Sequence, residues 1–309
     1  MALETREQVQ VMEAPRAASQ VVVGIVQSLR PKQWTKNGIV FAGLVFSRNL
    51  FVPELFLRTT LAFVLFCLVS GAVYLINDLA DLEKDRRHPV KRHRPLAAGV
   101  ITPWQGAVAA ALLLAISLPA AFALTPRLAL ALLAYLLLQL AYSFKLKHIV
   151  LLDVLVIAGG FVLRAVGGAW AINVPISPWL YVCTILLALF LGLAKRRHEL
   201  LLLEENAANH RRILDEYSTP LLNDLLGIVS SATIMAYSLY TFSADNLPRN
   251  HAMMLTIPFV IYGIFRYMYL VHRRNEGGSP ESVLLKDVPL IVTILLWGIT
   301  SLTILHFVR

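Results

Sequence analysis

Apolar segments of about 20 residues recur along almost the whole chain, separated by short polar breaks. A segment of this length crosses the hydrocarbon core of a bilayer as an α-helix. Of the 309 residues, 57% are hydrophobic and only 15% are charged, a balance that excludes a soluble domain of this size. We therefore predict an all-α, polytopic integral membrane protein with nine transmembrane helices, near residues 20–47, 56–77, 101–124, 126–144, 149–171, 177–196, 221–243, 251–271 and 286–307.

Basic residues are concentrated in alternate loops. The loops after the second, fourth, sixth and eighth spans carry most of the Lys and Arg, and the loops between them are short and poor in both. This alternation predicts a multi-pass protein of the cell (plasma) membrane with its amino terminus and basic loops in the cytoplasm and its carboxyl terminus outside. The net charge of +9 has the same origin, so no nucleic-acid partner is predicted. Residues 1–19 are expected to form a polar tail and residues 20–309 a single transmembrane catalytic domain.

Acidic residues are concentrated at the end of the second span. Asn77, Asp78, Asp81 and Asp85 are three or four residues apart, so on one continuous helix all four side chains would project from one stripe. Carboxylates this close repel one another unless a cation lies among them. Hard oxygen ligands suit Mg²⁺, with Mn²⁺ as an alternative, and substrate phosphates commonly complete its shell. We predict a metal site at these residues. The alternative is an ordinary helix end with solvated charges.

Two basic groups accompany this stripe. The first follows it directly and could hold phosphate oxygens through Arg87, Lys91 and Arg94. The second follows the sixth span, where Lys195 and Glu199 share a helix face and Arg196 flanks it. Cations with one carboxylate, at the same depth as the aspartates, predict a phosphate clamp. The alternative is that the basic residues only orient the chain in the membrane.

Further candidates for substrate binding lie in or beside the spans. At the end of the fourth span these are Tyr142, Lys145 and Lys147, although lysines at a span end also reach water without any ligand. Arg164 and Arg266 lie within spans, where a charge normally faces a cavity or a partner. Arg164 is equally suited to pair with a carboxylate. Arg266 and its neighbour Tyr267 lie where they could reach a phosphate.

These motifs resemble those of the UbiA superfamily of intramembrane prenyltransferases. The resemblance rests on Asn77-Asp78-x-x-Asp81-x-x-x-Asp85, on Arg94-Pro95-Leu96 and on Tyr142-x-x-x-Leu146-Lys147, and it covers nearly the whole chain. It implies a UbiA-type bundle of nine helices with polar cytoplasmic loops after helices 2 and 6. It also implies that two aspartate-rich motifs hold Mg²⁺ ions, which bridge a diphosphate.

The second motif departs from that pattern. Where the family usually has an aspartate pair after the sixth span, this chain has Lys195-Arg196-Arg197-His198-Glu199, which favours direct binding of phosphate. Together with Arg30-Pro31-Lys32-Gln33-Trp34-Thr35-Lys36-Asn37, this departure resembles the decaprenyl-phosphate phosphoribosyltransferase branch. The resemblance implies Mg²⁺-dependent transfer of 5-phosphoribose from phosphoribosyl diphosphate (PRPP) to decaprenyl or another polyprenyl phosphate. The products would be pyrophosphate and decaprenylphosphoryl-5-phosphoribose, a precursor of cell-wall arabinan.

On this interpretation the candidate residues divide by role. The expected catalytic residues are Asp78, Asp81, Lys195, Arg196 and Glu199. The expected metal ligands are Asn77, Asp78, Asp81 and Asp85. The expected substrate-binding residues are Lys32, Asn77, Asp85, Arg87, Lys91, Arg94, Tyr142, Lys145, Lys147, Arg164, Arg266 and Tyr267.

Two other functions remain open at this stage. An aromatic-acceptor polyprenyltransferase of quinone or related lipid synthesis would also use Mg²⁺, but it should carry carboxylates after the sixth span. A carrier or flippase for anionic lipids would explain the basic residues at the membrane face but not the stripe of Asn and Asp. The sequence is also compatible with a homo-oligomer.

Overall fold

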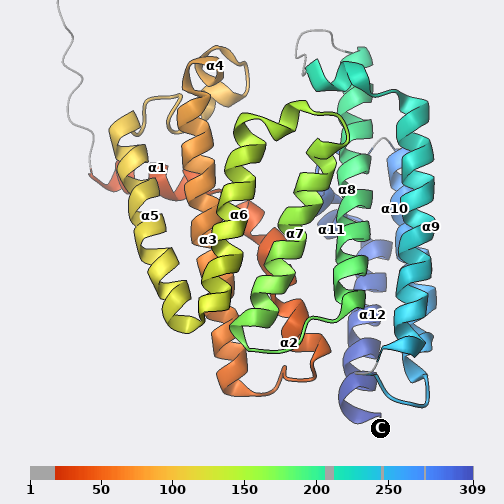
Figure 1. Ribbon diagram of the computed structural model, residues 1–309. Coiled ribbons are helices and arrows are strands. Elements are labelled where there is room, and N and C mark those ends of the chain that lie inside the picture. The colour runs from red at the N-terminus through yellow and green to blue at the C-terminus, as the bar shows by residue number, and fades with distance from the viewer. Residues whose placement is uncertain (1–17, 206–211, 245–246, 275, 309) are drawn as a thin grey trace, which may run out of the picture.

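The computed structural model describes residues 18–205, 212–244, 247–274 and 276–308. Most of the predicted polar tail, residues 1–17, lies outside this part of the chain. Eight of the helices in the described part are long and apolar enough to cross a bilayer, and they pack into one bundle (Figure 1). They are α3 (Pro53–Ala80), α5 (Pro103–Leu124), α6 (Pro126–Phe144), α7 (Leu152–Ala171), α8 (Pro178–Glu205), α9 (Thr219–Ser243), α10 (Ile257–Arg273, continuing η5, Ala252–Thr256) and α12 (Val288–Phe307).

Proline and capping residues mark where the long helices begin. Pro53, Pro103 and Pro126 each lie in a first turn, where the missing N–H leaves no hydrogen bond unmade. Thr102 and Gln105 form a reciprocal capping box at the start of α5. With these local signals, the second to ninth predicted spans agree with the structure to within a few residues, except that α8 continues to Glu205.

The first predicted span is wrong, and the described residues therefore contain eight long spanning helices rather than nine. In place of one helix over 20–47, the structure has α1 (Ala18–Ser28), the 3₁₀ helix η1 (Pro31–Phe41) and the short α2 (Ala42–Phe46). The backbone of Arg30 adopts the left-handed conformation, with a φ of 53°. The next residue, Pro31, has no N–H to continue the helical hydrogen bonds, so α1 cannot extend past this point. Helix α1 lies across the bundle (Figure 1).

A surface of small residues holds η1 and α2 against α7. A Cβ atom at Gly168 would come within 1.9 Å of the carbonyl oxygen of Val40, and one at Gly43 would come within 3.0 Å of the Cα atom of Ala169. The two backbones therefore touch directly. Irregular backbone at membrane depth persists only where protein covers it, and this close contact with α7 supplies that cover.

The candidate residues of α3 and α8 lie at one end of the bundle, here termed the polar end. Each helix has 28 residues and is therefore about 42 Å long, whereas the hydrocarbon core is only about 30 Å thick. Both helices have their carboxyl-terminal turns at this end (Figure 1). The short elements at this end are α4 (Leu82–Arg87), η2 (Lys91–His93), η3 (Leu146–His148) and η4 (Arg212–Glu216), and α11 (Pro280–Lys286) precedes α12.

Buried and exposed apolar residues show how the bundle fits a lipid environment. Helices α3 and α7 are the most buried of the long helices, and Phe66 of α3 is fully enclosed. On α5, by contrast, Leu112, Ile116 and Phe122 are all more than half exposed. An outward-facing apolar surface of this kind is expected to contact acyl chains.

Candidate functional site

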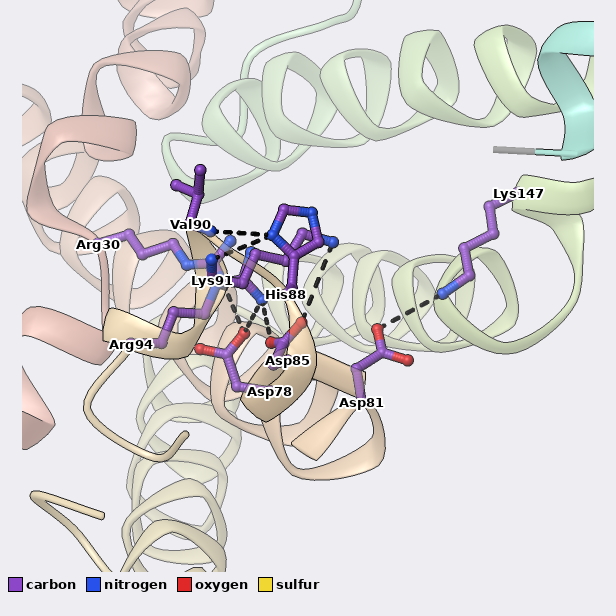
Figure 2. Close-up of polar contacts among 9 residues, drawn as sticks. All are labelled: Arg30, Asp78, Asp81, Asp85, His88, Val90, Lys91, Arg94 and Lys147. Carbon is purple, nitrogen blue, oxygen red and sulfur yellow. Dashed lines mark hydrogen bonds and ion pairs between the residues drawn. The ribbon is translucent and has the colours of Figure 1, made fainter. Parts of the chain in front are cut away.

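The acidic stretch does not lie on one continuous helix. Helix α3 ends at Ala80, and Asp81 has the dihedral angles φ −97° and ψ 9° before α4 begins at Leu82. The single stripe expected from the spacing is therefore divided. Asp78 and Asp85 lie side by side, whereas Asp81 is directed away from them, toward Lys147 (Figure 2).

Arginine side chains hold Asp78 and Asp85 together. Nη1 of Arg94 lies 3.0 Å from Oδ1 of Asp78 and 2.5 Å from Oδ2 of Asp85. Nη2 of Arg30 reaches the same oxygen of Asp78 at 2.6 Å, and Nζ of Lys91 lies 4.0 Å from Asp85. Both aspartate side chains are only 3% exposed, so their charges need compensation. These five residues form the acidic cluster.

The remaining candidates at the polar end are more open to solvent. Nζ of Lys147 lies 3.8 Å from Oδ2 of Asp81, and both side chains are between a quarter and a third exposed. Asn77 is half-buried, one turn before Asp81. Lys32, Arg87 and Lys145 are exposed. These residues are therefore accessible to a polar ligand that approaches from solution.

The donor chemistry of this end fits Mg²⁺, although the ligands are not assembled. Asn77, Asp78, Asp81 and Asp85 carry the amide and carboxylate oxygens that Mg²⁺ prefers. Among the described residues, no three Asp, Glu, His or Cys side chains converge as a ready-made metal site. Mg²⁺ commonly uses only one or two carboxylates, with substrate phosphates and water as its other ligands. The buried pair Asp78 and Asp85, which shares one guanidinium, meets that requirement.

Carboxylates already engage Arg196, the central residue of the predicted phosphate clamp. Its Nε donates to Oδ2 of Asp153 at 2.6 Å, its Nη1 donates to Glu199, and its Nη2 donates to the hydroxyl of Tyr142 at 3.2 Å. Arg196, Asp153, Glu199, Tyr142 and Tyr217 form the Arg196 cluster. Each nitrogen of Arg196 already donates one hydrogen bond, and its side chain is 3% exposed. The exposed cation of that prediction is Lys195, whose side chain is 41% exposed and whose Nζ lies 4.0 Å from Glu199.

Tyr217 completes the Arg196 cluster from the segment before α9. Its hydroxyl donates to Oδ1 of Asp153 at 2.7 Å and accepts from the backbone N–H of Leu151 at 2.8 Å. Burial raises the pKa of Tyr217, and the hydrogen bond to Asp153 raises it further. The hydroxyl therefore stays protonated and supports the carboxylate that holds Arg196.

A cavity of about 1190 Å³ lies inside the bundle. Its walls are mainly apolar and come from η1, α2 and most of the long helices. No Asp or Glu of the described residues lines it, and its charged lining residues are all cations, namely Lys36, Arg164, Lys195 and Arg196. Large apolar cavities suit lipid-like ligands. The cationic lining adds a place for an anionic group.

Arg164 reaches this cavity from α7 and is 6% exposed. Its Nε donates to Oδ1 of Asn37 at 2.6 Å, and its Nη2 donates to the hydroxyl of Tyr135 at 2.7 Å. None of the ion pairs found among the described residues involves Arg164. The carboxylate partner expected as one alternative is therefore not found there.

Comparison with known proteins now decides the family. The sequence pattern of the UbiA prenyltransferase family matches residues 38–286. The chain belongs to this family. The predicted resemblance is confirmed, and the protein is a UbiA-family transferase that crosses the membrane several times. A carrier function has no support from this finding.

Relatives in the UbiA family cover most of the chain. The chain is 36% identical over 281 residues to the decaprenyl-phosphate phosphoribosyltransferase of Mycobacterium tuberculosis, with 90% of this chain and 92% of the relative covered. It is 36% identical over 283 residues to the protein of that name from Corynebacterium glutamicum, with 89% and 84% covered. A solved structure of a UbiA homolog from Archaeoglobus fulgidus, bound to DMAPP and Mg²⁺, has a TM-score of 0.68 at 18% identity and covers 92% of this chain and 99% of its own. That likeness shows a shared fold, and the fold is one in which a relative binds Mg²⁺.

Within this UbiA-family bundle, Arg266 lies apart from the two polar clusters. Its Nε and Nη2 donate to the two carboxylate oxygens of Asp287 at 3.0 and 2.8 Å, which ties α10 to the start of α12. The hydrogen bond from Arg266 holds the pKa of Asp287 below its usual value. Tyr267, in contrast, lines the cavity. Of these two candidates, only Tyr267 is placed where a ligand in the cavity would meet it.

Three residues that the sequence did not single out lie in the candidate site. Arg30 was part of a noted motif but was not singled out, although its neighbour Pro31 signals a chain reversal that brings it to Asp78. Asp153, at the start of an apolar span, has the sequence position of an ordinary helix-end residue, yet its side chain is completely buried against Arg196. Gln139 lines the cavity. A lone amide within an apolar span was the available signal.

Proposed function

We propose that this protein transfers 5-phosphoribose from PRPP to decaprenyl phosphate or a similar polyprenyl phosphate. The observation that carries this proposal is the apolar cavity with an exclusively cationic charged lining, which lies beside a polar end rich in carboxylates. An acceptor with a long apolar chain and a phosphate head matches such a cavity. The names of the relatives at 36% identity support the same activity.

The donor would bind at the acidic cluster and its surroundings. Asn77, Asp78, Asp81 and Asp85 would hold Mg²⁺, which when bound would neutralise charge on the departing pyrophosphate. Arg30, Lys91 and Arg94 already lie at these carboxylates, so they are placed to contact the donor's phosphate oxygens. The exposed residues Lys32, Arg87 and Lys145 would add further contacts from the solvent side.

The transfer itself needs no general base. An ionised phosphate oxygen of the acceptor attacks C1 of the ribose, the bond from C1 to the diphosphate oxygen breaks, and pyrophosphate leaves with the electron pair. The protein must instead bring two polyanions together without prohibitive repulsion. Lys195 and Lys147 would supply positive charge at the polar end, on the donor's side, while Glu199 and Asp153 fix Arg196 and, through it, Tyr142.

The basic loops predict which side of the membrane holds this chemistry. Lys84, Arg86 and Arg87 belong to α4, and Lys145 and Lys147 lie at η3, which are both short elements of the polar end. Because Lys and Arg are retained in cytoplasmic loops, we propose that the polar end faces the cytoplasm. The donor would then bind from the cytoplasm, and the acceptor would enter from the bilayer.

The test is transfer by the purified protein in detergent with Mg²⁺, PRPP and decaprenyl phosphate. Mass spectrometry of the lipid fraction should show a new lipid-linked phosphoribose that requires all three components. A parallel reaction with a prenyl diphosphate and an aromatic acid tests the alternative function, an aromatic-acceptor polyprenyltransferase. The likeness to the fold of the DMAPP-bound relative keeps this alternative open. Turnover in the parallel reaction alone would overturn the proposal, as would no turnover in either.

A further inference from the structure

Arg164 places a cation deep inside the membrane-spanning part of the bundle. It lies 12 residues after Leu152, where α7 leaves the polar end. At a rise of 1.5 Å per residue this is about 18 Å, past the middle of a hydrocarbon core about 30 Å thick. Charged residues at this depth are costly and normally face a cavity or a partner.

Neutral groups surround the Arg164 guanidinium, whose central carbon lies 4.6 Å from the ring centroid of Tyr135 and 5.2 Å from that of Phe161. Nε and Nη2 are held by the neutral oxygens of Asn37 and Tyr135. Among the described residues, no hydrogen bond to Nη1 and no ion pair of Arg164 is found. The side chain lines the cavity. The two rings offset part of the cost of burying the charge, but none of these partners is negatively charged, so an anion at this position would be favourable.

A second hydrogen-bond donor, the amide of Gln139, lies near Nη1 of Arg164. A Cβ atom at Gly160 would come within 2.8 Å of the Gln139 amide nitrogen and 3.5 Å of Nη1 of Arg164, so both nitrogens lie close to one point. The absence of a side chain at Gly160 lets the Gln139 amide pack closely against α7. Gln139 also lines the cavity, and no hydrogen bond of its amide is found among the described residues. Two nitrogen donors therefore lie close together at the cavity, and no protein acceptor for either is found among the described residues.

We propose that Arg164 and Gln139 bind the phosphate group of the acceptor lipid, an inference that rests on the proposed function. Ser70 and Tyr74, which line the cavity, precede Asp78 on α3, and Ser70 is about 12 Å from Asp78 along that helix. A donor diphosphate at Asp78 would extend its ribose toward this level. The acceptor phosphate would then lie on the far side of C1 from the leaving group. The apolar walls near Trp179 and Trp297 would take the lipid chain.

Arg164 also has a structural role, because it ties η1 to α6 and α7. Gln139 separates the two roles, since it has no hydrogen bond of its own among the described residues. Gln139→Met should leave the unfolding temperature unchanged and raise the KM for decaprenyl phosphate about 10-fold, the effect of one hydrogen bond to a charged group. The KM for PRPP should not change.

Gln139→Glu gives the sharper result, because it supplies the carboxylate that Arg164 lacks. The protein should unfold at the same or a higher temperature, while the KM for decaprenyl phosphate rises about 100-fold or more. A purely structural Arg164 predicts unchanged kinetics in both Gln139 variants, and that result would overturn the inference. Arg58→Gln is the matched control. Arg58 holds the carbonyl oxygens of Ala171 and Leu124 and does not line the cavity, so this variant should lose thermal stability but keep both KM values.

A binding measurement removes the dependence on turnover. Farnesyl phosphate should raise the unfolding temperature of the wild type more than farnesol does, and this difference should vanish in Gln139→Glu. Ribose 5-phosphate should stabilise both proteins equally, which distinguishes the lipid phosphate from the donor's phosphate. Equal shifts by farnesyl phosphate in both proteins would contradict the inference. If the wild type transfers no phosphoribose but binds farnesyl phosphate as described, the proposed function fails and the phosphate site stands.

Discussion

Nε of Arg196 on α8 lies 2.6 Å from Oδ2 of Asp153 on α7, and neither side chain is more than 3% exposed. Tyr217 binds the other oxygen of the same carboxylate. The pair therefore joins two helices of the bundle beneath the polar end. The basic sequence after the sixth span therefore contributes a buried arginine that joins helices, Arg196, and a partly exposed cation, Lys195.

Asp153→Ala should destabilise the protein strongly, because it leaves a buried guanidinium without one of its two carboxylates. The expected loss is about 3–5 kcal/mol, or roughly 10 °C in the unfolding temperature in detergent. Glu54→Ala, which removes the exposed partner of Arg58, should cost little. Equal unfolding temperatures for the two variants would show that the buried ion pair stabilises the protein no more than the exposed one does.

Tyr217→Phe should cost about 1–3 kcal/mol, since it leaves the Leu151 N–H and one Asp153 oxygen without their partner. The effect should depend on pH with a definite sign. Because the pKa of Tyr217 is raised in the folded protein, its contribution is complete below the unfolded value of about 10 and falls as the pH rises above it. Thermal unfolding of both proteins from pH 7 to 11 checks this, and a constant difference across that range would contradict it.

Asp78→Asn and Asp81→Asn should each lower Mg²⁺-dependent turnover by about 100-fold or more, because each removes a charged ligand for the ion that stabilises the leaving group. Glu83→Gln provides the control, since Glu83 pairs with Arg86 on the exposed side of α4. Turnover is measured against Mg²⁺ concentration. Full activity in both aspartate variants at low Mg²⁺ would place the metal elsewhere.

Asp287→Asn should lower the unfolding temperature at neutral pH, because it removes the charge that Arg266 binds while an amide can still cap α12. The pKa of Asp287 is lowered in the folded protein, so the ion pair contributes fully above the unfolded value near 3.9 and is lost as the pH falls through the folded value. Wild type and variant should therefore converge in acid. Activity per folded molecule should stay unchanged. A loss of activity would indicate that Arg266 binds substrate, as the sequence predicted.

Hydropathy and local signals were enough to predict most of the fold. Eight spans could be placed because apolar length, proline and capping residues act locally, as at Thr102 and Pro103. The first span could not, because its conformation depends on distant residues. Gly168 of α7 admits the backbone of Val40, and no local pattern in residues 20–47 reports that contact.

The residue types of the candidate site could be predicted from the sequence, but the pairs that these residues form could not. The metal-ligand chemistry of Asp78, Asp81 and Asp85 follows from composition, whereas the break at Asp81 follows from the chain's turn into α4. The pairing of Arg196 with Asp153 spans 43 residues, and neither residue's sequence neighbours indicate it. Charges that neutralise one another through the fold look identical, in sequence, to charges that await a ligand.

The most direct test of the central claim is pyrophosphate release by the purified wild-type protein with Mg²⁺. The account predicts rapid release only when PRPP and decaprenyl phosphate are both present, with one lipid-linked phosphoribose formed for each pyrophosphate. It also predicts that Asp78→Asn nearly abolishes this release. Release from PRPP without the lipid, or none with both substrates while a prenyl diphosphate is consumed, would contradict phosphoribosyl transfer as the function of this site.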